Sequence, residues 1–263
     1  MEPLPDPRPT TPSWDLNCDL GEGEPPERTT ELMLEIDSAN IACGAHAGDV
    51  ASMRRCLETA ALHGVHAGAH PGFPDRAGFG RTLPASFLLT PAILVAMLRE
   101  QIGILDALSR EWGVPLHHVK LHGALYHAVD GDPELARAYL EIVGRDWPAL
   151  KVYARAGGGV ARVGRTMIAP PEIWEEGYLD RAYLDDGTLV PRTAPDAVLE
   201  SVDDVLARVR DLRDGGRCRT ISGNWLALAA RTWCVHGDSP GAVNLLRAVG
   251  RFRGRDRRSA QRA

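Results

Sequence analysis

Residues 38–70 read SANIACGAHAGDVASMRRCLETAALHGVHAGAH and contain one complete unit of the pattern that decides the fold. A short apolar run, Ser38–Cys43, passes through a glycine-containing turn into an amphipathic segment, Ala51–His63, and a second apolar run, Val65–Ala69, follows. Asp49 stands where its side chain can cap the start of the helix. Because a helix joins the two runs, we expect them to be parallel strands of one sheet.

The same pattern continues on both sides of this stretch. Short apolar or β-branched runs predict strands at Trp14–Cys18, Ser38–Cys43, Val65–Ala69, His118–Leu121, Lys151–Ala154, Glu172–Glu175 and Trp233–Val235. Amphipathic segments predict helices at Ala51–His63, Ala85–Trp112, Pro133–Gly144, Asp203–Arg213 and Pro240–Val249. Ser239 can cap the last helix, and Ser222-Gly223-Asn224 predicts a hairpin turn within Arg219–Ala229.

About seven βα units in one chain favour a closed (β/α) barrel over an open doubly wound sheet, which is the structural alternative. No low-complexity linker interrupts the chain, so we expect a single barrel domain over residues 14–250. Residues 1–13 predict a disordered lead-in that is no secretion signal, because they lack a basic start and an apolar stretch. Residues 251–263 carry six arginines and predict a basic, flexible tail.

The composition is that of an ordinary soluble enzyme, with 44% apolar and 25% charged residues among 263. The formal net charge of −5 gives no general attraction to nucleic acid or to an anionic membrane. No apolar run approaches the roughly 20 residues that cross a bilayer. The five cysteines are odd in number and form no CxxC pair, which favours reduced thiols in a cytoplasmic protein.

Polar residues gather at the carboxyl ends of the predicted strands, where βα barrels build their active sites. Asp15, Asn17 and Asp19 alternate along the first strand and therefore point to one face. That face is the barrel lumen or, in a plainer interpretation, a solvated surface. Asn40 lies in the second strand, and His46 follows between small residues that leave room for a substrate or a metal.

Two further strands end in similar surroundings. His70 lies among small residues after the third strand, and Arg81, farther along, offers a fork suited to a carboxylate. Lys120 and His122 lie on the same side of the fourth strand. Lys120 is one of only two lysines among thirty cationic side chains, which indicates that its compact ammonium group is needed there.

The remaining polar groups follow the last two strands. Asp180 and Arg181 form an acidic–basic pair that could be a plain surface ion pair, and His236 precedes Asp238. Any single histidine is more often structural than functional. Four strand-end histidines, several carboxylates and a rare lysine together predict a hydrolytic site that binds a divalent metal or uses general acid–base catalysis.

The glycine-rich segment Ala156-Gly157-Gly158-Gly159 matches no phosphate-binding motif, so we expect a flexible turn before a helix. The sequence GxxxxGK[ST] does not occur. If ATP is used, this chain does not bind it through a P-loop.

These motifs occur together, and in one order, in a known family. The motifs are Asp15–Glu22 (DLNCDLGE), Asn40–Asp49 (NIACGAHAGD), Gly68–Gly72 (GAHPG), Gly78–Arg81 (GFGR), Val119–Tyr126 (VKLHGALY), Asp180–Tyr183 (DRAY) and Cys234–Asp238 (CVHGD). The chain resembles the LamB/YcsF family, the A subunits of 5-oxoprolinase, from about Trp14 to Val249. It departs from the family pattern at Leu121, usually Pro, and at Tyr178-Leu179-Asp180, usually Phe-Ala-Asp.

The resemblance implies a barrel of the glycoside hydrolase/deacetylase type and a hydrolase acting on a cyclic amide. In the cytoplasm, it would cleave the lactam of 5-oxo-L-proline to L-glutamate with ATP and with partner subunits B and C. Residues implied to line the catalytic site are Asp19, His46, His70, Lys120, His122 and His236. Further substrate contacts are expected from Asn17, Asn40, Arg81, Asp180, Arg181 and Asp238.

Roles within this set follow from its chemistry as hypotheses. Asp19 or a neighbouring histidine would be the general base, while Lys120 and His122 would stabilise developing negative charge. Arg81 or Arg181 would bind the substrate carboxylate. The candidates for a divalent metal are Asp19, His46 and His70. Association with further copies of the chain stays open.

Two other functions compete with this interpretation. One is a stand-alone, metal-dependent deacetylase or amidohydrolase in which Asp19 and two histidines hold zinc. The other is a non-catalytic scaffold for kinase-like subunits. The polar strand ends argue against the scaffold, because a scaffold has no need for a polar pocket.

Overall fold

The computed structural model describes residues 14–254 and contains a closed barrel of seven parallel strands. Its strands are β1 (Asp15–Leu20), β2 (Ser38–Ala42), β3 (His66–His70), β4 (His118–Lys120), β5 (Lys151–Arg155), β6 (Ile173–Tyr178) and β9 (Thr232–Cys234). Each strand pairs with its neighbours in parallel, and β9 closes the ring against β1. The predicted seven-stranded (β/α) barrel is confirmed, and the open sheet is excluded.

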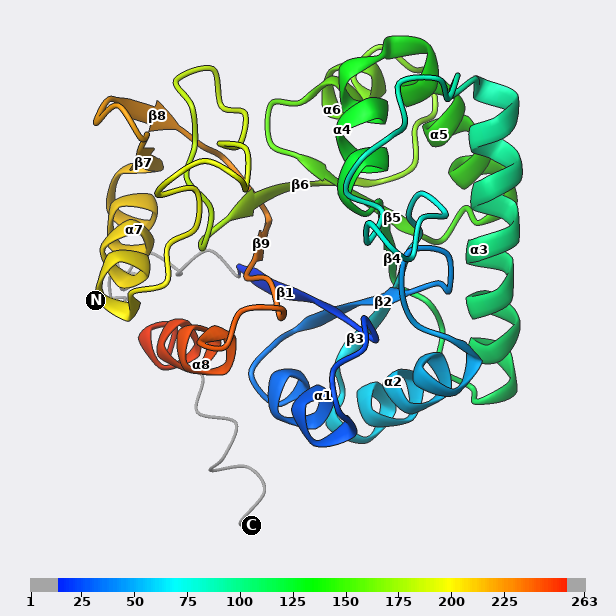
Figure 1. Ribbon diagram of the computed structural model, residues 1–263, viewed down its shortest axis with the longest axis horizontal. Helices are drawn as coiled ribbons and strands as arrows, with labels where there is room; N and C mark the ends of the chain where they lie inside the picture. The colour runs from blue at the N-terminus through cyan, green and yellow to red at the C-terminus, as the bar shows by residue number, and fades with distance from the viewer. Residues whose placement is uncertain (1–13, 255–263) are drawn as a thin grey trace, which may run out of the picture.

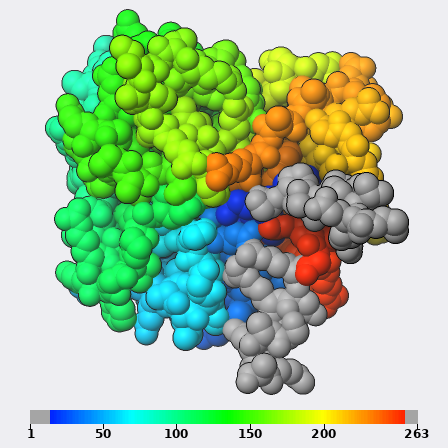
Figure 2. All heavy atoms as spheres, turned by 180° about the vertical axis from the view of Figure 1, so that it is seen from behind, coloured from blue at the N-terminus to red at the C-terminus, as the bar shows by residue number. Residues whose placement is uncertain are grey.

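Helices surround the barrel on its outside (Figure 1). They are α1 (Pro26–Met33), α2 (Val50–His63), α3 (Pro91–Glu111), α4 (Gly123–Gly131), α5 (Pro133–Asp146), α6 (Gly159–Gly164), α7 (Val202–Gly215) and α8 (Ala242–Phe252). Seen from behind in Figure 2, orange residues of the late part of the chain lie against the blue residues of its beginning, where β9 pairs with β1. None of the helices in the described part of the chain is both long and apolar enough to cross a membrane.

A small antiparallel ribbon lies beside α7, outside the barrel. It consists of β7 (Arg217–Arg219) and β8 (Trp225–Ala227), and Gly223 adopts a positive φ of 83° in the turn between them. The hairpin predicted at this position is confirmed. The predicted turn before a helix is confirmed as well, because Gly157 has a φ of 67° shortly before α6 begins.

The expected lead-in, residues 1–13, lies outside the described residues, as do residues 255–263 of the expected tail. Residues 251 and 252 form the end of α8, and Arg253 donates a hydrogen bond of 2.8 Å to Asp37. The division of the chain into a lead-in, one domain and a tail stays a prediction.

Two helix starts differ from the prediction. The helix expected from residue 85 begins only at Pro91, because Thr90 accepts a hydrogen bond from the amide of Ile93 and Pro91 needs no hydrogen-bond acceptor at this position. Ser239 does not cap α8, whose N-cap is Gly241 with no side-chain hydrogen bond. The predicted cap at Asp49 is confirmed, since its carboxylate accepts from the amide of Ser52 at 2.7 Å.

Apolar side chains cover the outside of the barrel wall, whereas polar side chains fill the lumen. Leu16, Ile41 and Val152 belong to the core between strands and helices. Asn17, in contrast, donates hydrogen bonds across the lumen to Glu176 on β6 at 3.0 Å and to Thr232 on β9 at 2.6 Å. Burial of such groups is tolerated only when they are paired, so the lumen is a hydrogen-bonded network.

A glycine makes room for the centre of this network. His118 contacts Asn40 at 2.7 Å through Nε2 and stacks on the ring of Tyr153 at 4.0 Å. A Cβ atom on Gly68, in the neighbouring strand, would lie 2.1 Å from that same Nε2. The imidazole cannot move aside without losing a buried hydrogen bond and its stacking partner.

We predict that Gly68→Ala lowers the free energy of unfolding by about 1–3 kcal/mol, because overpacking a filled interior forces side chains out of place. Urea unfolding followed by circular dichroism measures the change. Gly103→Ala in α3 is the matched control, since its Cβ would meet nothing within 4 Å. The control should be neutral or more stable by about 0.5–1 kcal/mol. Equal stability of the two variants would contradict the packing argument.

Candidate active site

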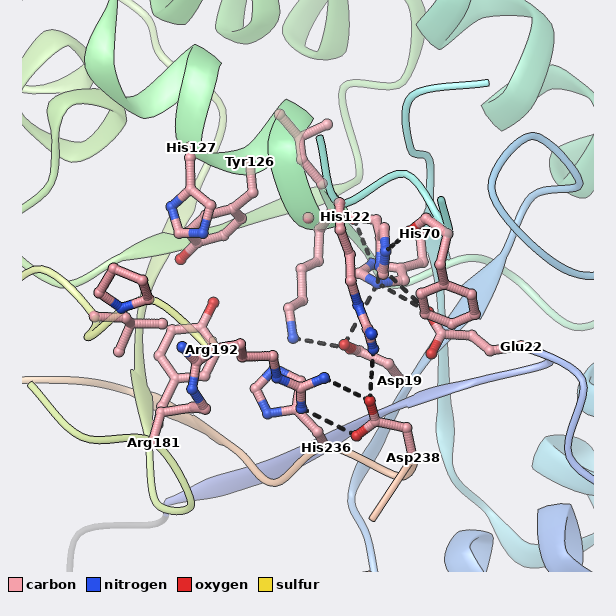
Figure 3. A pocket seen from close by; sticks show the side chains of 18 of the residues that line it. Asp19, Glu22, His70, His122, Tyr126, His127, Arg181, Arg192, His236 and Asp238 are labelled. Carbon is pink, nitrogen blue, oxygen red and sulfur yellow. Dashed lines mark hydrogen bonds and ion pairs between the residues drawn. The ribbon is translucent and has the colours of Figure 1, made fainter. Parts of the chain in front are cut away.

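A cavity of about 370 Å³ opens at the carboxyl ends of the barrel strands (Figure 3). This volume is within the range of roughly 300–1,000 Å³ that small-molecule sites occupy. Its lining includes Asp19, His70, Lys120, His122 and His236. These residues come from β1, β3, β4, the start of α4 and the segment after β9, so the barrel brings distant parts of the chain to one place.

The ammonium group of Lys120 lies between two carboxylates at the floor of the cavity. Its Nζ is 2.9 Å from Asp19 Oδ1 and 3.0 Å from Glu176 Oε1, and it also contacts Cys234 Sγ at 3.2 Å. Burial lowers the pKa of Lys120, but the surrounding acidic groups, Asp19 first and Glu176 among them, together outweigh burial and raise this pKa well above its usual value. Lys120 is therefore charged, and it compensates two buried carboxylates.

Asp19 lines the cavity beside Lys120. Its Oδ1 accepts hydrogen bonds from Asn40 at 2.8 Å and from Lys120, while its Oδ2 lies 3.5 Å from His70 Nε2. Burial raises the pKa of Asp19, but the charges of His70 and Lys120 outweigh it and hold this pKa well below its usual range. Burial lowers the pKa of His70, but Asp19 and Glu22 together outweigh burial and raise this pKa.

Three imidazole rings converge on Glu22, which follows β1 after a turn at Gly21. The carboxylate oxygen Oε1 of Glu22 lies 3.1 Å from His46 Nε2, 3.2 Å from His122 Nδ1 and 3.7 Å from His70 Nε2. Burial raises the pKa of Glu22, but the adjacent imidazoles of His122 and His46 lower it to about 2. Each of the four residues offers one ligand atom within 4.8 Å of the others, so this group could hold a metal ion.

His236 lines the cavity and is paired with a buried carboxylate, Asp180. His236 Nδ1 lies 2.9 Å from Asp180 Oδ2, which also accepts the backbone amide of His236 at 2.8 Å. Burial raises the pKa of Asp180, but His236 outweighs it and lowers this pKa below its usual value. The ring of His236 stacks on Tyr178, which fixes its plane. With Nδ1 donating to Asp180, Nε2 carries the lone pair.

Cationic side chains line the rim. Both Arg81 and Arg192 donate hydrogen bonds to Asp238. Arg81 Nη2 lies 2.8 Å from Asp238 Oδ2, and Arg192 Nη2 lies 3.0 Å from Asp238 Oδ1. The Nε atom of Arg192 is buried and has no hydrogen-bond partner among the residues described. Arg181 also lines the cavity, but it donates to the carbonyl oxygens of Ala197 and Val190 and so holds a loop.

Four of the residues expected in the site do not line this cavity. Asn17 and Asn40 lie in the lumen beneath it, where their amides bond to one another and to Asp19 or Glu176. Asp180 is buried behind His236, which it orients. His46 is buried behind His122, and the two rings stack at 3.8 Å. Burial lowers the pKa of His46 to about 4.

Three residues that the sequence pattern did not single out are central to the geometry. Glu22 stands within a quoted motif, but only the turn at Gly21, with a φ of 72°, directs its carboxylate toward the histidines. Glu176 was missed because the sixth strand was expected to end at residue 175, three residues before its observed end at Tyr178. Arg192 comes from a loop without any motif, so no local signal could have identified it.

Replacing Lys120 with methionine should lower the free energy of unfolding by about 3–5 kcal/mol, because it leaves Asp19 and Glu176 as uncompensated buried charges. Lys151→Met is the matched control at the only other lysine, which is half-buried at the other end of the barrel over Trp174. We expect the control to change stability by less than about 1 kcal/mol. Urea unfolding measures both variants, and a similar small loss in each would show that the buried ammonium is dispensable.

Comparisons with known proteins agree with this architecture. A family model described as the LamB/YcsF family matches residues 14–259. The A subunit of 5-oxoprolinase from Pyrococcus furiosus is 43% identical over 234 residues, which are 88% of this chain and 90% of that protein. The crystal structure of the lactam utilization protein from Thermus thermophilus has a TM-score of 0.81 at 34% identity, and the match covers 92% of this chain and 97% of that one. The chain therefore belongs to the LamB/YcsF family.

Proposed function

We propose that this chain is the A subunit of an ATP-dependent 5-oxoprolinase, which hydrolyses the lactam of 5-oxo-L-proline to L-glutamate together with subunits B and C. The observation that carries the proposal is the 43% identity to the A subunit of a 5-oxoprolinase over most of both chains. The likeness to a lactam utilization protein supports the same class of substrate.

The chain is proposed to work in the cytoplasm. All five cysteines are free thiols, which is usual in a reducing compartment. In this proposal, assembly with subunits B and C supplies the ATP-dependent step; this chain has no P-loop sequence. Whether several copies of the chain assemble is left to measurement of the mass of the complex.

ATP is required because the lactam amide is stabilised by resonance and reacts slowly with water. In the proposed sequence the partner subunits transfer the γ-phosphoryl group of ATP to the lactam oxygen, which leaves ADP. Water then adds to the ring carbon, the carbon–nitrogen bond breaks as the nitrogen gains a proton, and an acyl phosphate remains. A second water hydrolyses this acyl phosphate to the carboxylate and inorganic phosphate.

His236 is the general base in this proposal. Asp180 accepts its Nδ1 proton and leaves the Nε2 lone pair for a water molecule, as in other histidine–carboxylate pairs that activate nucleophiles. The same proton can return to the departing ring nitrogen. Asp19 is less suited to this role, because its Oδ1 already accepts two hydrogen bonds and its charge stabilises Lys120.

The arginines at the rim bind the carboxylate of the substrate. Arg192 is better placed than Arg181, because Arg181 already donates to two backbone carbonyls whereas the guanidinium of Arg192 contacts the side chain of Asp238 at the rim of the cavity. Arg81, on the far side of Asp238, adds a second positive charge. Lys120 supplies a fixed positive charge at the cavity floor for the negative charge that develops at the lactam oxygen. His122, also expected in this role, does not take it here, because its Nε2–H donates to Phe79 and its Nδ1 faces Glu22.

The decisive experiment is reconstitution of the purified chain with subunits B and C and measurement of L-glutamate formed from 5-oxo-L-proline. We expect glutamate only when ATP and all three subunits are present. A reconstituted complex that forms no glutamate would overturn the proposal. Removal of the acetyl group from N-acetylated sugars by this chain alone, without ATP, would instead establish the deacetylase, which the Glu22–histidine group favours.

His236→Gln should lower kcat of the complex by about 10²–10⁴-fold, because a positioned general base contributes that much to proton transfer. Asp180→Asn should also lower kcat, since it removes the group that selects the reactive tautomer of His236. His127→Gln is the control, because His127 is exposed and lines the same cavity without a carboxylate hydrogen bond. Unchanged turnover of the His236 and Asp180 variants would favour a scaffold that only positions the other subunits.

A further inference from the structure

Backbone carbonyl groups determine where two imidazole rings carry their protons. His70 Nδ1 lies 2.8 Å from the carbonyl oxygen of Lys120, and His122 Nε2 lies 2.9 Å from the carbonyl oxygen of Phe79. A carbonyl oxygen can only accept a hydrogen bond, so both of these nitrogens carry a proton. In the neutral ring the other nitrogen, Nε2 of His70 and Nδ1 of His122, then has a lone pair.

The two lone pairs meet a third acceptor. His70 Nε2 and His122 Nδ1 are 3.0 Å apart, and Glu22 Oε1 is 3.7 Å from the first and 3.2 Å from the second. When both rings are neutral, no proton lies between these three atoms, and three electron-rich atoms then face one another inside the protein. Such an arrangement is unfavourable unless a cation lies among them.

The spacing of these atoms suits a transition metal. Zinc binds imidazole nitrogen and carboxylate oxygen at about 2.0–2.2 Å in a tetrahedral arrangement, which puts neighbouring ligand atoms about 3.3 Å apart. The separations within the group are 3.0, 3.2 and 3.7 Å, and His46 Nε2 adds a fourth atom 3.1 Å from Glu22 Oε1. Histidine ligands of metals almost always donate their second nitrogen to a carbonyl or carboxylate, as His70 and His122 do here.

We propose that Glu22, His70 and His122, completed by His46, bind one divalent transition metal of the zinc type. Imidazole and carboxylate donors suit zinc, whereas Mg²⁺ and Ca²⁺ prefer all-oxygen sites. Asp19, a metal candidate from the sequence, is outside the proposed ligand set: its Oδ1 accepts from Asn40 and Lys120, and its Oδ2 lies 3.5 Å from His70 but is not part of the group whose ligand atoms all lie within 4.8 Å of one another.

A second cluster of possible ligands, Asp19, Cys234 and His236, is not a metal site in this proposal. Asp19, Cys234 and His236 also bring ligand atoms within 4.8 Å of one another. The ammonium group of Lys120, however, lies 2.9 Å from Asp19 Oδ1 and 3.2 Å from Cys234 Sγ. A positive charge is therefore already present among these donors, and a metal would be repelled.

The test is titration of the chelator-treated full chain with ZnCl₂ by isothermal calorimetry, without substrate or partner subunits. We expect one zinc per chain. Loss of a group that only hydrogen-bonds a metal ligand already weakens metal affinity by about 10–100-fold. Glu22→Gln and His70→Ala each alter a ligand itself, so each should weaken the zinc affinity by more than about 100-fold. Loading the unmodified chain with Co²⁺ should produce the intense visible absorption of a tetrahedral site. This measurement needs no variant, so it does not depend on how well the variants fold.

His127→Ala is the matched control, since it removes a histidine that lines the cavity outside the group, and its zinc affinity should equal that of the unmodified chain. The proposal is overturned if no zinc binds, if the Glu22 and His70 variants bind as the control does, or if Co²⁺ gives only weak octahedral absorption. In that case a proton shared by His70 and His122 compensates Glu22. Because binding is measured without lactam turnover, either result is separate from the fate of the proposed function.

Discussion

The ammonium group of Lys120 is the interaction on which the interior of the barrel depends. It joins carboxylates from β1 and β6, on either side of β9, and without it two negative charges would face each other with little water to screen them. Its contact with Asp19 also determines which oxygen of Asp19 is left to face His70. The same ammonium group therefore balances the charge in the lumen and determines the arrangement of the cavity floor.

This interaction also explains a feature of the composition. The chain uses arginine almost everywhere that a positive charge occurs, yet it has lysine at position 120. The site offers contacts to two carboxylates and a sulfur around a single nitrogen atom. A planar guanidinium is wider and binds in a fork, whereas an ammonium group is compact and donates in three directions.

Much of the fold followed from periodicity alone. Alternation of Asp15, Asn17 and Asp19 predicted that all three share a face, and the contacts of Asn17 across the barrel put that face in the lumen. The order of strands and helices predicted the barrel, because each unit repeats the same local pattern. Helix starts were less predictable where a proline and a threonine cap competed with apolar periodicity, as at Pro91.

The site was only partly predictable, because strand-end position does not say how far a side chain reaches. The strand-end residues Asp19, His70, Lys120, His122 and His236 do line one cavity. His46 stops behind the ring of His122, and Glu22 reaches the histidines only through the backbone turn that precedes it. The approach of Arg192 to Asp238 depends on a loop whose path has no signature in composition or spacing.

Closure of the barrel by β9 against β1 has a consequence for biosynthesis. Asn17 finds its partner Thr232 only 215 residues later in the chain. Until the ribosome has released that last strand, the polar residues of β1 have no lumen to enter and remain hydrated, while the apolar outer wall is already present. Contacts of such sequence separation carry a large cost of loop closure, so we expect closure of the barrel by β9 to be a late step in folding.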